Sequence, residues 1–270
     1  MFSLSCVIQS HSHIFDEKAL SVLMNDAMLT QVVNVARTQI EVAIKSEKSN
    51  FSTIEEFYPK AHLIASCFVI ALNVSSLGHF TWASGNQLYP TYEVAPVDRR
   101  QRVIFSTQRH LPYDGKVLTE AEVEQTMIIF GSVMREKDET IRTEYVKGIL
   151  HMGLSFAEIN FDKEAFANFY RSFEYFVTRK ILLVKKLNNE VKEIAKAIRS
   201  SGLSDEFVPE FSKLYKIRSA QVMHAQLEQT EITQDDVIKM KVFIDYFLHQ
   251  HYTRIPNIWL EKQRNPESDR

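Results

Sequence analysis

Phenylalanine recurs at helical spacing through the C-terminal half of the chain, and this pattern constrains the fold more than any other. Between residues 163 and 187, Phe166, Phe169, Phe173 and Phe176 fall on one face of a helix with 3.6 residues per turn. A helix with a continuous apolar face must cover that face with another element. The chain has 18 Phe and only 7 Gly in 270 residues, which favours helices over turn-rich β structure. We therefore expect a mainly α fold.

The residues after this helix predict further helices joined by short links. Gly202 interrupts the pattern, and Pro209 suits the first turn of a helix that runs to about Gln229. Asp235 and Asp236 begin a last helix. Three or four helices joined in this way predict an antiparallel bundle over residues 161–255, followed by a polar tail at 256–270.

Residues 1–160 predict a separate, mostly helical domain. Apolar residues at helical spacing predict one or two amphipathic helices over residues 16–48 (Leu20, Leu23, Met24, Ala27, Met28 and Val32). Capping boxes at Ser52 with Glu55, or Thr53 with Glu56, begin another helix. That helix continues past Pro59 into the apolar run 61–74, which is too short to span a bilayer and is expected to cross a core.

Residues 78–116 have a different character, with several prolines and glycines. Three short runs typical of strands (79–82, 88–95 and 102–107) predict a small strand-and-loop insertion. Helix resumes at a capping box formed by Thr119 and Glu122 and extends to Arg135. One further helix is marked by apolar residues at helical spacing (Ile141, Tyr145, Ile149, Met152 and Phe156).

Charge is distributed unevenly along the chain, although the net charge is only −2. Residues 1–162 carry a net −5, residues 163–230 a net +4 and residues 231–270 a net −1. A basic segment in an acidic chain attracts polyanions, but it is equally typical of a solvated helix face. Two isolated cysteines, Cys6 and Cys67, and the lack of a signal-peptide pattern indicate reduced thiols in a soluble, cytoplasmic protein.

Several signatures of enzymes are missing from the sequence. It contains no glycine-rich phosphate loop, no HExxH, no GxSxG and no Cys/His zinc spacing. Two short histidine motifs, His11-Ser12-His13 and His249-Gln250-His251, are weak metal candidates because two histidines alone make a poor site. We therefore expect neither a metal nor a cofactor.

One segment, residues 214–225 (LYKIRSAQVMHA), combines Arg218 and His224 on a predicted helix. At 100° per residue, Arg218, Gln221, His224 and Glu228 form a polar stripe on one side of that helix. Arginine holds a phosphate through two hydrogen bonds, and histidine moves a proton near neutral pH. Such a pair can cleave RNA without a metal, through attack of the ribose 2'-hydroxyl on the adjacent phosphate.

The spacing alone decides nothing, because about one Arg/His pair at this separation is expected by chance in such a chain. The alternative interpretation is a solvated arginine and a histidine at the surface or at the edge of the core. The surrounding residues carry more information. Leu214-Tyr215-Lys216-Ile217-Arg218-Ser219 followed by His224 resembles the catalytic segment of the HEPN superfamily, in the branch with a Leu-Tyr-x-x-Arg-Ser motif.

The resemblance extends to an earlier helix, where residues 168–176 (NFYRSFEYF) match the family's aromatic run with an embedded acid, Glu174. At the border of the apolar face, Glu174 is placed to reach the next helix, or it is a solvated acid paired with Arg171 or Thr178. The resemblance covers residues 161–252, about a third of the chain. Ser219, where the family often has Asn, Asp or His, and Ala225, in place of the usual Gly, depart from its pattern.

The resemblance implies a metal-independent endoribonuclease that acts as a homodimer through the C-terminal bundle. Arg218 and His224 would be the catalytic pair, with Ser219, Gln221, Glu174 and Tyr215 in support. A toxin or an anti-phage defence effector would act on RNA in this way, and residues 1–160 would sense a trigger or recruit a target. A regulator or antitoxin is a further expected partner, and a membrane is not. The alternative is a HEPN-like module that dimerises or binds RNA without cleaving it.

Overall fold

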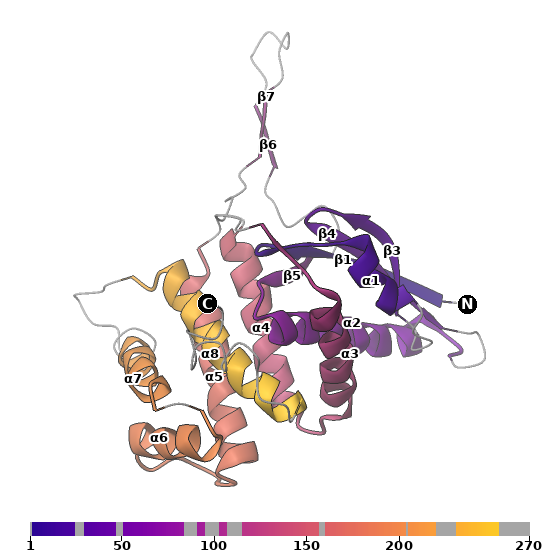
Figure 1. The fold of residues 1–270 in the computed structure, drawn as a ribbon. Helices are drawn as coiled ribbons and strands as arrows, with labels where there is room; N and C mark the ends of the chain where they lie inside the picture. Colours follow the sequence, from indigo (N-terminus) through magenta and orange to yellow (C-terminus); the bar gives the residue numbers. More distant parts are fainter. Residues whose placement is uncertain are drawn as a thin grey trace, which may run out of the picture. The chain divides into compact units, whose positions relative to one another are not determined.

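The computed structural model describes residues 2–24, 30–46, 51–83, 91–94, 103–106, 115–156, 160–203, 205–219 and 231–253 (Figure 1). The protein is mainly helical within these ranges, as expected, but its N-terminal part contains a four-stranded antiparallel sheet. The chain divides into two compact units. The first unit is Met1–Phe130 with Ile149–Phe161, and the second is Gly131–Gly148 with Asp162–Arg270.

The first unit contains eight strands and two whole helices among its described residues, and it shares helices α3 and α4 with the second unit. In chain order its elements are β1 (Phe2–Ser10), β2 (His13–Ile14), α1 (Glu17–Met24), β3 (Thr30–Ala36), β4 (Gln39–Ser46), α2 (Ile54–Ser76), β5 (Phe80–Ala83), β6 (Thr91–Val94), β7 (Val103–Ser106), β8 (Lys116–Val117), α3 (Glu120–Arg135) and α4 (Glu139–Phe156).

The sheet has the strand order β3-β4-β1-β5, with every neighbouring pair antiparallel. Side chains alternate between its faces. Ile8 opposes Ile40 on the buried face, whereas Ser5 donates a 2.5 Å hydrogen bond to Glu41 on the other, more exposed face. Helix α2 packs against β1, β4 and β5. One apolar face and one polar face are typical of an antiparallel sheet that is covered on one side.

The order of elements β1-α1-β3-β4-α2-β5, together with this strand order, is that of the split β-α-β topology of ferredoxin-like domains. Each helix connects two strands of the same direction, and a third, antiparallel strand lies between them. Domains of this topology have many functions, so the topology alone assigns none.

The helices expected over residues 16–48 are largely wrong. Among the residues of this range that the structure describes, only Glu17–Met24 is helical, and β3 and β4 occupy Thr30–Ala36 and Gln39–Ser46. Ile40, Val42 and Ile44 alternate with Glu41 and Lys45, which is the period of a half-buried strand. β-branched residues pack well on a pleated surface, and pairing with β1 determines the outcome here.

Helix α2 begins and lies where the sequence predicts. Thr53 caps it and accepts a hydrogen bond from the amide of Glu56, whose carboxylate in turn accepts from the amide of Ser52. The run 61–74 is almost wholly buried, as expected of a core helix. Among the described helices, α2 alone is long and apolar enough to cross a membrane, and 72% of its most apolar window is buried inside the protein.

The strands expected within residues 78–116 form where the structure describes them, but the first is not part of an insertion. The runs 88–95 and 102–107 contain β6 and β7, which pair antiparallel, whereas β5 overlaps the run 79–82 and forms the edge of the main sheet. Thr119 and Glu122 exchange the hydrogen bonds of a capping box at the start of α3. Helix α4 buries all five of its predicted apolar residues, Ile141, Tyr145, Ile149, Met152 and Phe156.

The second unit also contains α5 (Asp162–Phe176), the π-helix η1 (Val177–Ile181), α6 (Glu190–Ser200), α7 (Phe207–Ile217) and α8 (Gln234–Thr253). Helix α5 packs against α8, and Phe173 lies among Phe211, Phe243 and Phe247, with ring centroids 5.1–5.9 Å away. The Phe face of the sequence is therefore the core of this unit. The helix expected over 163–187 is too long, because it ends at Ile181 and Leu183 has a φ of 54°.

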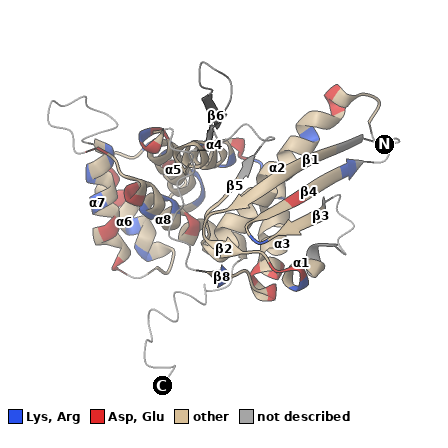
Figure 2. Cartoon of the chain, turned by 90° about the horizontal axis from the view of Figure 1, so that it is seen from above, with Lys and Arg blue, Asp and Glu red and all other residues tan. Residues whose placement is uncertain are grey.

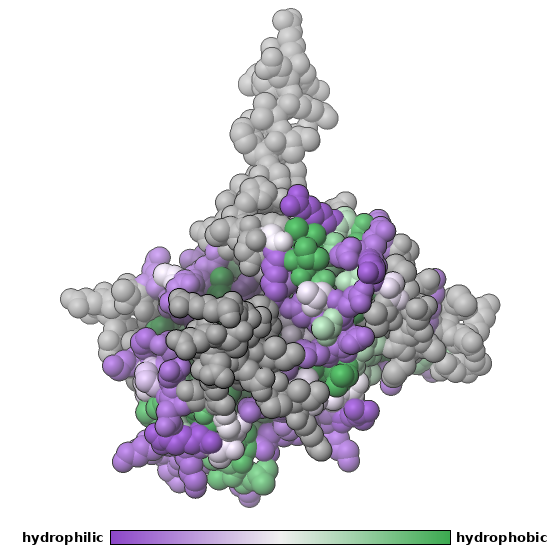
Figure 3. Space-filling view, in the orientation of Figure 1, coloured by the Kyte–Doolittle hydropathy of each residue, from purple (hydrophilic) through white to green (hydrophobic). Residues whose placement is uncertain are grey.

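The helix expected from Pro209 to Gln229 is α7, which is followed by Arg218 and Ser219, and residues 220–229 lie outside the described part of the chain. Exposed large apolar side chains occur in several parts of the described chain: Ile54, Tyr58, Val117, Ile128, Leu150, Leu183 and Val184. On the face drawn in Figure 3, hydrophobic areas of the described surface are separated by hydrophilic ones.

Candidate active site

Arg218 follows the last residue of α7, at a position that the core of the second unit fixes. Phe211 and Leu214 are buried and anchor α7, and the Phe211 ring lies 6.1 Å from the ring of Tyr215. The backbone amide of Arg218 donates to the carbonyls of Leu214 and Tyr215, so the helical turn continues through it. The side chain of Arg218 is thus attached to a backbone that is hydrogen-bonded to the last turn of α7.

The Arg218 guanidinium lies between two carboxylates. Its Nη1 is 3.3 Å from Oε2 of Glu190 in the first turn of α6, and its Nη2 is 3.9 Å from Oε2 of Glu174 in α5. Its Cζ is 5.3 Å from the ring centroid of Tyr170, also in α5. The Arg218 side chain is 20% exposed, so these interactions are only partly screened by water.

Hydrogen bonds connect these groups further. The hydroxyl of Tyr170 donates to Oε1 of Glu190 at 2.5 Å, which leaves Oε2 for Arg218. Burial raises the pKa of Tyr170, and the neighbouring Glu190 raises it further, so Tyr170 stays a neutral donor. Burial also raises the pKa of Glu174, and Glu190 adds to that effect while Arg218 opposes it. The single positive charge of Arg218 is thus shared by the carboxyl groups of Glu174 and Glu190.

The structure brings together some of the residues that the sequence singles out. Glu174 reaches Arg218, as its place at the border of the apolar face predicts. The alternative pairing of Glu174 is not formed with Arg171, which contacts Glu144 and Asn168 instead. Thr178 donates to the backbone carbonyl of Glu174 and so does not engage its carboxylate through that bond.

The remaining predicted site residues divide into two groups. Tyr215 and Ser219 are half-buried on either side of Arg218 in the chain. His224 and Gln221 lie outside the described residues, as does Glu228. The predicted catalytic pair is thus described for its arginine and not for its histidine.

Two residues of this cluster, Glu190 and Tyr170, are not among those expected from the sequence. Asn189 caps α6 by accepting a hydrogen bond from the amide of Lys192, so Glu190 stands in the first turn, where acids are favoured. That signal places an acid at a helix start but does not identify its partner. The contact with Arg218 spans 28 residues and depends on how α6 packs near α7.

The histidine motifs do not assemble a metal site in the described part of the chain, where no group of three His, Cys, Asp or Glu side chains occurs. Burial lowers the pKa of His11 to about 4, and its Nε2 lies 3.0 Å from the Thr81 hydroxyl. Burial likewise lowers the pKa of His249 to about 4. His251 lines a cavity of about 370 Å³ with Lys180, Gln250 and other residues of α5, η1, α6 and α8. Cys6 and Cys67 do not form a disulfide with each other.

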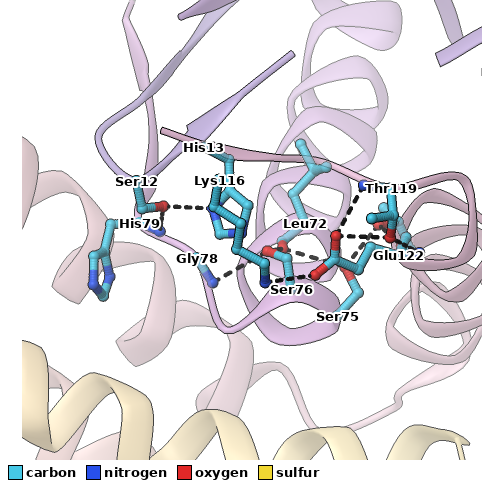
Figure 4. Close-up of polar contacts among 11 residues, drawn as sticks. Ser12, His13, Leu72, Ser75, Ser76, Gly78, His79, Lys116, Thr119 and Glu122 are labelled. Carbon is cyan, nitrogen blue, oxygen red and sulfur yellow. Dashed lines mark hydrogen bonds and ion pairs between the residues drawn. The ribbon is translucent and has the colours of Figure 1, made fainter. Parts of the chain in front are cut away.

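A second polar cluster lies in the first unit, where the turn after β1 meets the turn after α2 (Figure 4). Ser12 Oγ lies 2.8 Å from Nδ1 of His13 and accepts a 2.7 Å hydrogen bond from the amide of His79. Nearby, Lys116 donates to Glu122 at 2.8 Å, and Glu122 also caps α3. These bonds satisfy backbone groups in turns, so the cluster is explained by its role in holding the loops together.

No family model, curated protein or solved structure matches the chain.

Proposed function

We propose that the protein is a metal-independent endoribonuclease in which Arg218 and His224 act on the scissile phosphate. The observation that carries the proposal is the placement of the Arg218 guanidinium. It is partly exposed, and two carboxylates and an aromatic ring from α5 and α6 hold it in one orientation. An arginine whose planar group is oriented before binding loses less freedom when it grips a phosphate. The motif around it resembles the catalytic segment of HEPN ribonucleases.

In the proposed step, His224 removes the proton from the ribose 2'-hydroxyl, and that oxygen attacks the adjacent phosphorus. The bond from phosphorus to O2' forms and the bond from phosphorus to O5' breaks, so the upstream fragment ends in a 2',3'-cyclic phosphate. The leaving O5' takes a proton, supplied by a histidine acting as general acid. Arg218 stabilises the extra negative charge on the phosphoryl oxygens, because oriented charge is often the largest contribution to catalysis.

Glu174, Glu190 and Tyr170 are proposed as positioning residues in this scheme. Glu190 accepts from both Tyr170 and Arg218, so it fixes the guanidinium plane from one side. Glu174, at 3.9 Å, is the weaker and more exposed contact. A phosphate that binds Arg218 replaces at least one of these carboxylates. Burial raises the pKa of Glu174, so its charged form is already disfavoured where it stands beside Arg218.

We further propose a homodimer, formed through the C-terminal helices, in which two Arg/His motifs face one cleft. A second copy would supply the histidine that acts as general acid. A toxin or an anti-phage effector in the cytoplasm is the biological role that fits such an activity, with residues 1–160 sensing a trigger, recruiting a target or binding a regulator.

One observation favours a second candidate function, an RNA-binding or dimerisation module without turnover. Arg218 is outnumbered by the carboxylates that hold it, and a structural ion-pair network would have the same appearance. The two functions differ in their products. The purified protein should be incubated with defined RNAs, with and without EDTA, and the fragment ends sequenced. Cyclic phosphate ends in EDTA support the nuclease, provided that a 2'-deoxy substitution at the scissile position blocks cleavage. RNA that is bound but intact supports the module.

A further inference from the structure

The Lys and Arg residues of segment 163–230 divide into those that form ion pairs with described acids and those that do not. Six of the twelve Lys and Arg residues in 163–230 form ion pairs with described acids: Arg171, Arg179, Lys180, Arg199, Lys213 and Arg218. Three of these acids, Glu144, Asp138 and Glu136, come from outside the segment. The net +4 of the segment is therefore not spread evenly over its surface.

The other six lysines are exposed, and no carboxylate of the described residues lies within 4.0 Å of them. Four lie in one stretch of twelve residues: Lys185 and Lys186 before α6, and Lys192 and Lys196 within it. We call these four residues the lysine surface. Figure 2 shows the basic and acidic residues that mark α6 and α7.

The two acids of α6 form no ion pair with the lysine surface, because both have other partners. Glu190 accepts hydrogen bonds from Tyr170 and Arg218. Glu193 accepts from the backbone amides of Asn188 and Asn189 at the helix start. Their carboxylates are thus held by partners other than the lysines beside them in the chain.

The geometry of α6 presents Lys192 and Lys196 away from the protein. The two residues are about 40° apart in helical projection, and their Cα atoms are separated by a rise of about 6 Å. Ile194, Ala197 and Ile198 are fully buried and fill the opposite side of the helix. Since the apolar side of α6 is already covered by protein, the helix cannot insert that side into a bilayer.

We infer that the lysine surface binds the phosphate backbone of single-stranded RNA. In helical projection, Lys192 and Lys196 lie about 160° and 120° from Glu190, the α6 residue that contacts Arg218, so the lysine surface is on another side of α6 and adds affinity without touching the Arg218 site. Lysines act as point charges and read phosphates without regard to base sequence, so this contact sets affinity and leaves specificity to other residues. The inference rests on the proposed function, since RNA is the partner that the Arg218 site would take.

The test compares two variants of the full chain with equal net charge. The first carries Lys185→Gln, Lys186→Gln, Lys192→Gln and Lys196→Gln. The control removes four exposed but ion-paired charges through Arg171→Gln, Arg179→Gln, Arg199→Gln and Lys213→Gln. Both are made in a His224→Ala background, which prevents cleavage. Fluorescence anisotropy with a labelled single-stranded RNA gives the affinity over a series of salt concentrations, and circular dichroism checks the fold.

The slope of log affinity against log salt should fall by about 0.7 for each phosphate that is no longer neutralised, or about 2.8 for the lysine variant, and by much less for the control. Equal reductions in the two variants would overturn the inference, because net charge alone would then explain binding. Binding to vesicles rich in anionic lipid, without binding to RNA, would overturn it as well. If the wild type cleaves RNA while the lysine variant keeps the full slope, only this inference fails. If the lysine variant alone loses RNA binding and the wild-type protein does not cleave RNA, only the proposed nuclease activity fails.

Discussion

Replacing Lys241 by Met should destabilise the second unit far more than the loss of any exposed ion pair. The Lys241 ammonium contacts Asp245 at 2.5 Å, one turn further along α8, and both side chains are completely buried. The Tyr145 hydroxyl in α4 donates a further hydrogen bond to Asp245. Burial raises the pKa of Asp245 and lowers that of Lys241, so each charge depends on the other for its stability.

The magnitude follows from this complete burial. Removing one partner of a buried pair costs about 3–5 kcal/mol, because the other charge stays behind without compensation. The same helix provides a matched control, since Lys239 and Asp235 form a pair of equal spacing and length, with side chains 59% and 70% exposed. Lys239→Met should change the free energy of unfolding far less, because water screens this exposed pair. Removing all three polar groups, with Lys241→Met, Asp245→Leu and Tyr145→Phe, should restore most of the missing stability.

Urea denaturation followed by circular dichroism measures the destabilisation, and hydrogen exchange of the α8 amides assigns it to the second unit if the two units unfold separately. The pH dependence of the free energy of unfolding gives a second test. Without Lys241, the pKa of Asp245 in the folded state rises further above its value in the unfolded state. Stability is then fully present below the unfolded pKa and is lost as pH rises through the folded one, so Lys241→Met should cost less at pH 5 than at pH 7. Equal destabilisation by Lys241→Met and Lys239→Met would refute the reasoning.

Three further outcomes are expected. His224→Ala should lower the rate of RNA cleavage by about 10²- to 10⁴-fold without changing the circular dichroism spectrum. The control Arg171→Ala should leave that rate unchanged. A wild-type cleavage rate for His224→Ala would refute the proposed mechanism. Light scattering at micromolar concentration should show a dimer, and a monomer alone would contradict a shared cleft. Thr119→Ala should lower the free energy of unfolding by about 0.5–2 kcal/mol, because it removes the cap of α3, while Thr143→Ala on the exposed face of α4 should have almost no effect on that free energy.

Features that depend on neighbouring residues were predictable from the sequence. The caps at Thr53 and Thr119 each need only a partner three residues away, and both form as expected. The periodic apolar faces of α4 and α5 are likewise local patterns, and their residues are buried. The helix starts and the core of the second unit follow from such patterns without knowledge of the tertiary structure.

Features that depend on distant residues were not predictable in the same way. Residues 39–46 alternate in polarity, but a pattern of period two becomes a strand only when a partner such as β1 supplies the hydrogen bonds. The overlapping helical spacing that ends at Val32 favoured the wrong element. The role of Glu190 in the candidate site could not be predicted from a local pattern either, since its contact with Arg218 links positions 28 residues apart. Leu183, with a φ of 54°, ends the long Phe helix without a glycine to mark the break.

The charge balance at Arg218 determines how its substitution must be interpreted. Arg218→Ala should abolish cleavage, but it also leaves Glu174 and Glu190 close together without their shared cation. The pKa of Glu174, already raised by burial, then rises further. Stability would be retained at low pH and lost as pH rises through the folded pKa of Glu174. A fall in activity at pH 7 would therefore combine an effect on the fold with an effect on the chemistry, and the two must be separated.

Combining Arg218→Ala with Glu190→Gln separates them. The glutamine keeps the shape of Glu190 and can still accept from the Tyr170 hydroxyl, while the excess negative charge is removed. If Arg218 stabilises the phosphate, the double variant should regain the thermal stability and the pH dependence of the wild type, and its cleavage rate should stay as low as that of Arg218→Ala. Glu190→Gln alone is the control, and it should retain part of the activity because Arg218 is present. Recovery of cleavage in the double variant would show that Arg218 only joins α7 to its neighbours and takes no part in the chemistry.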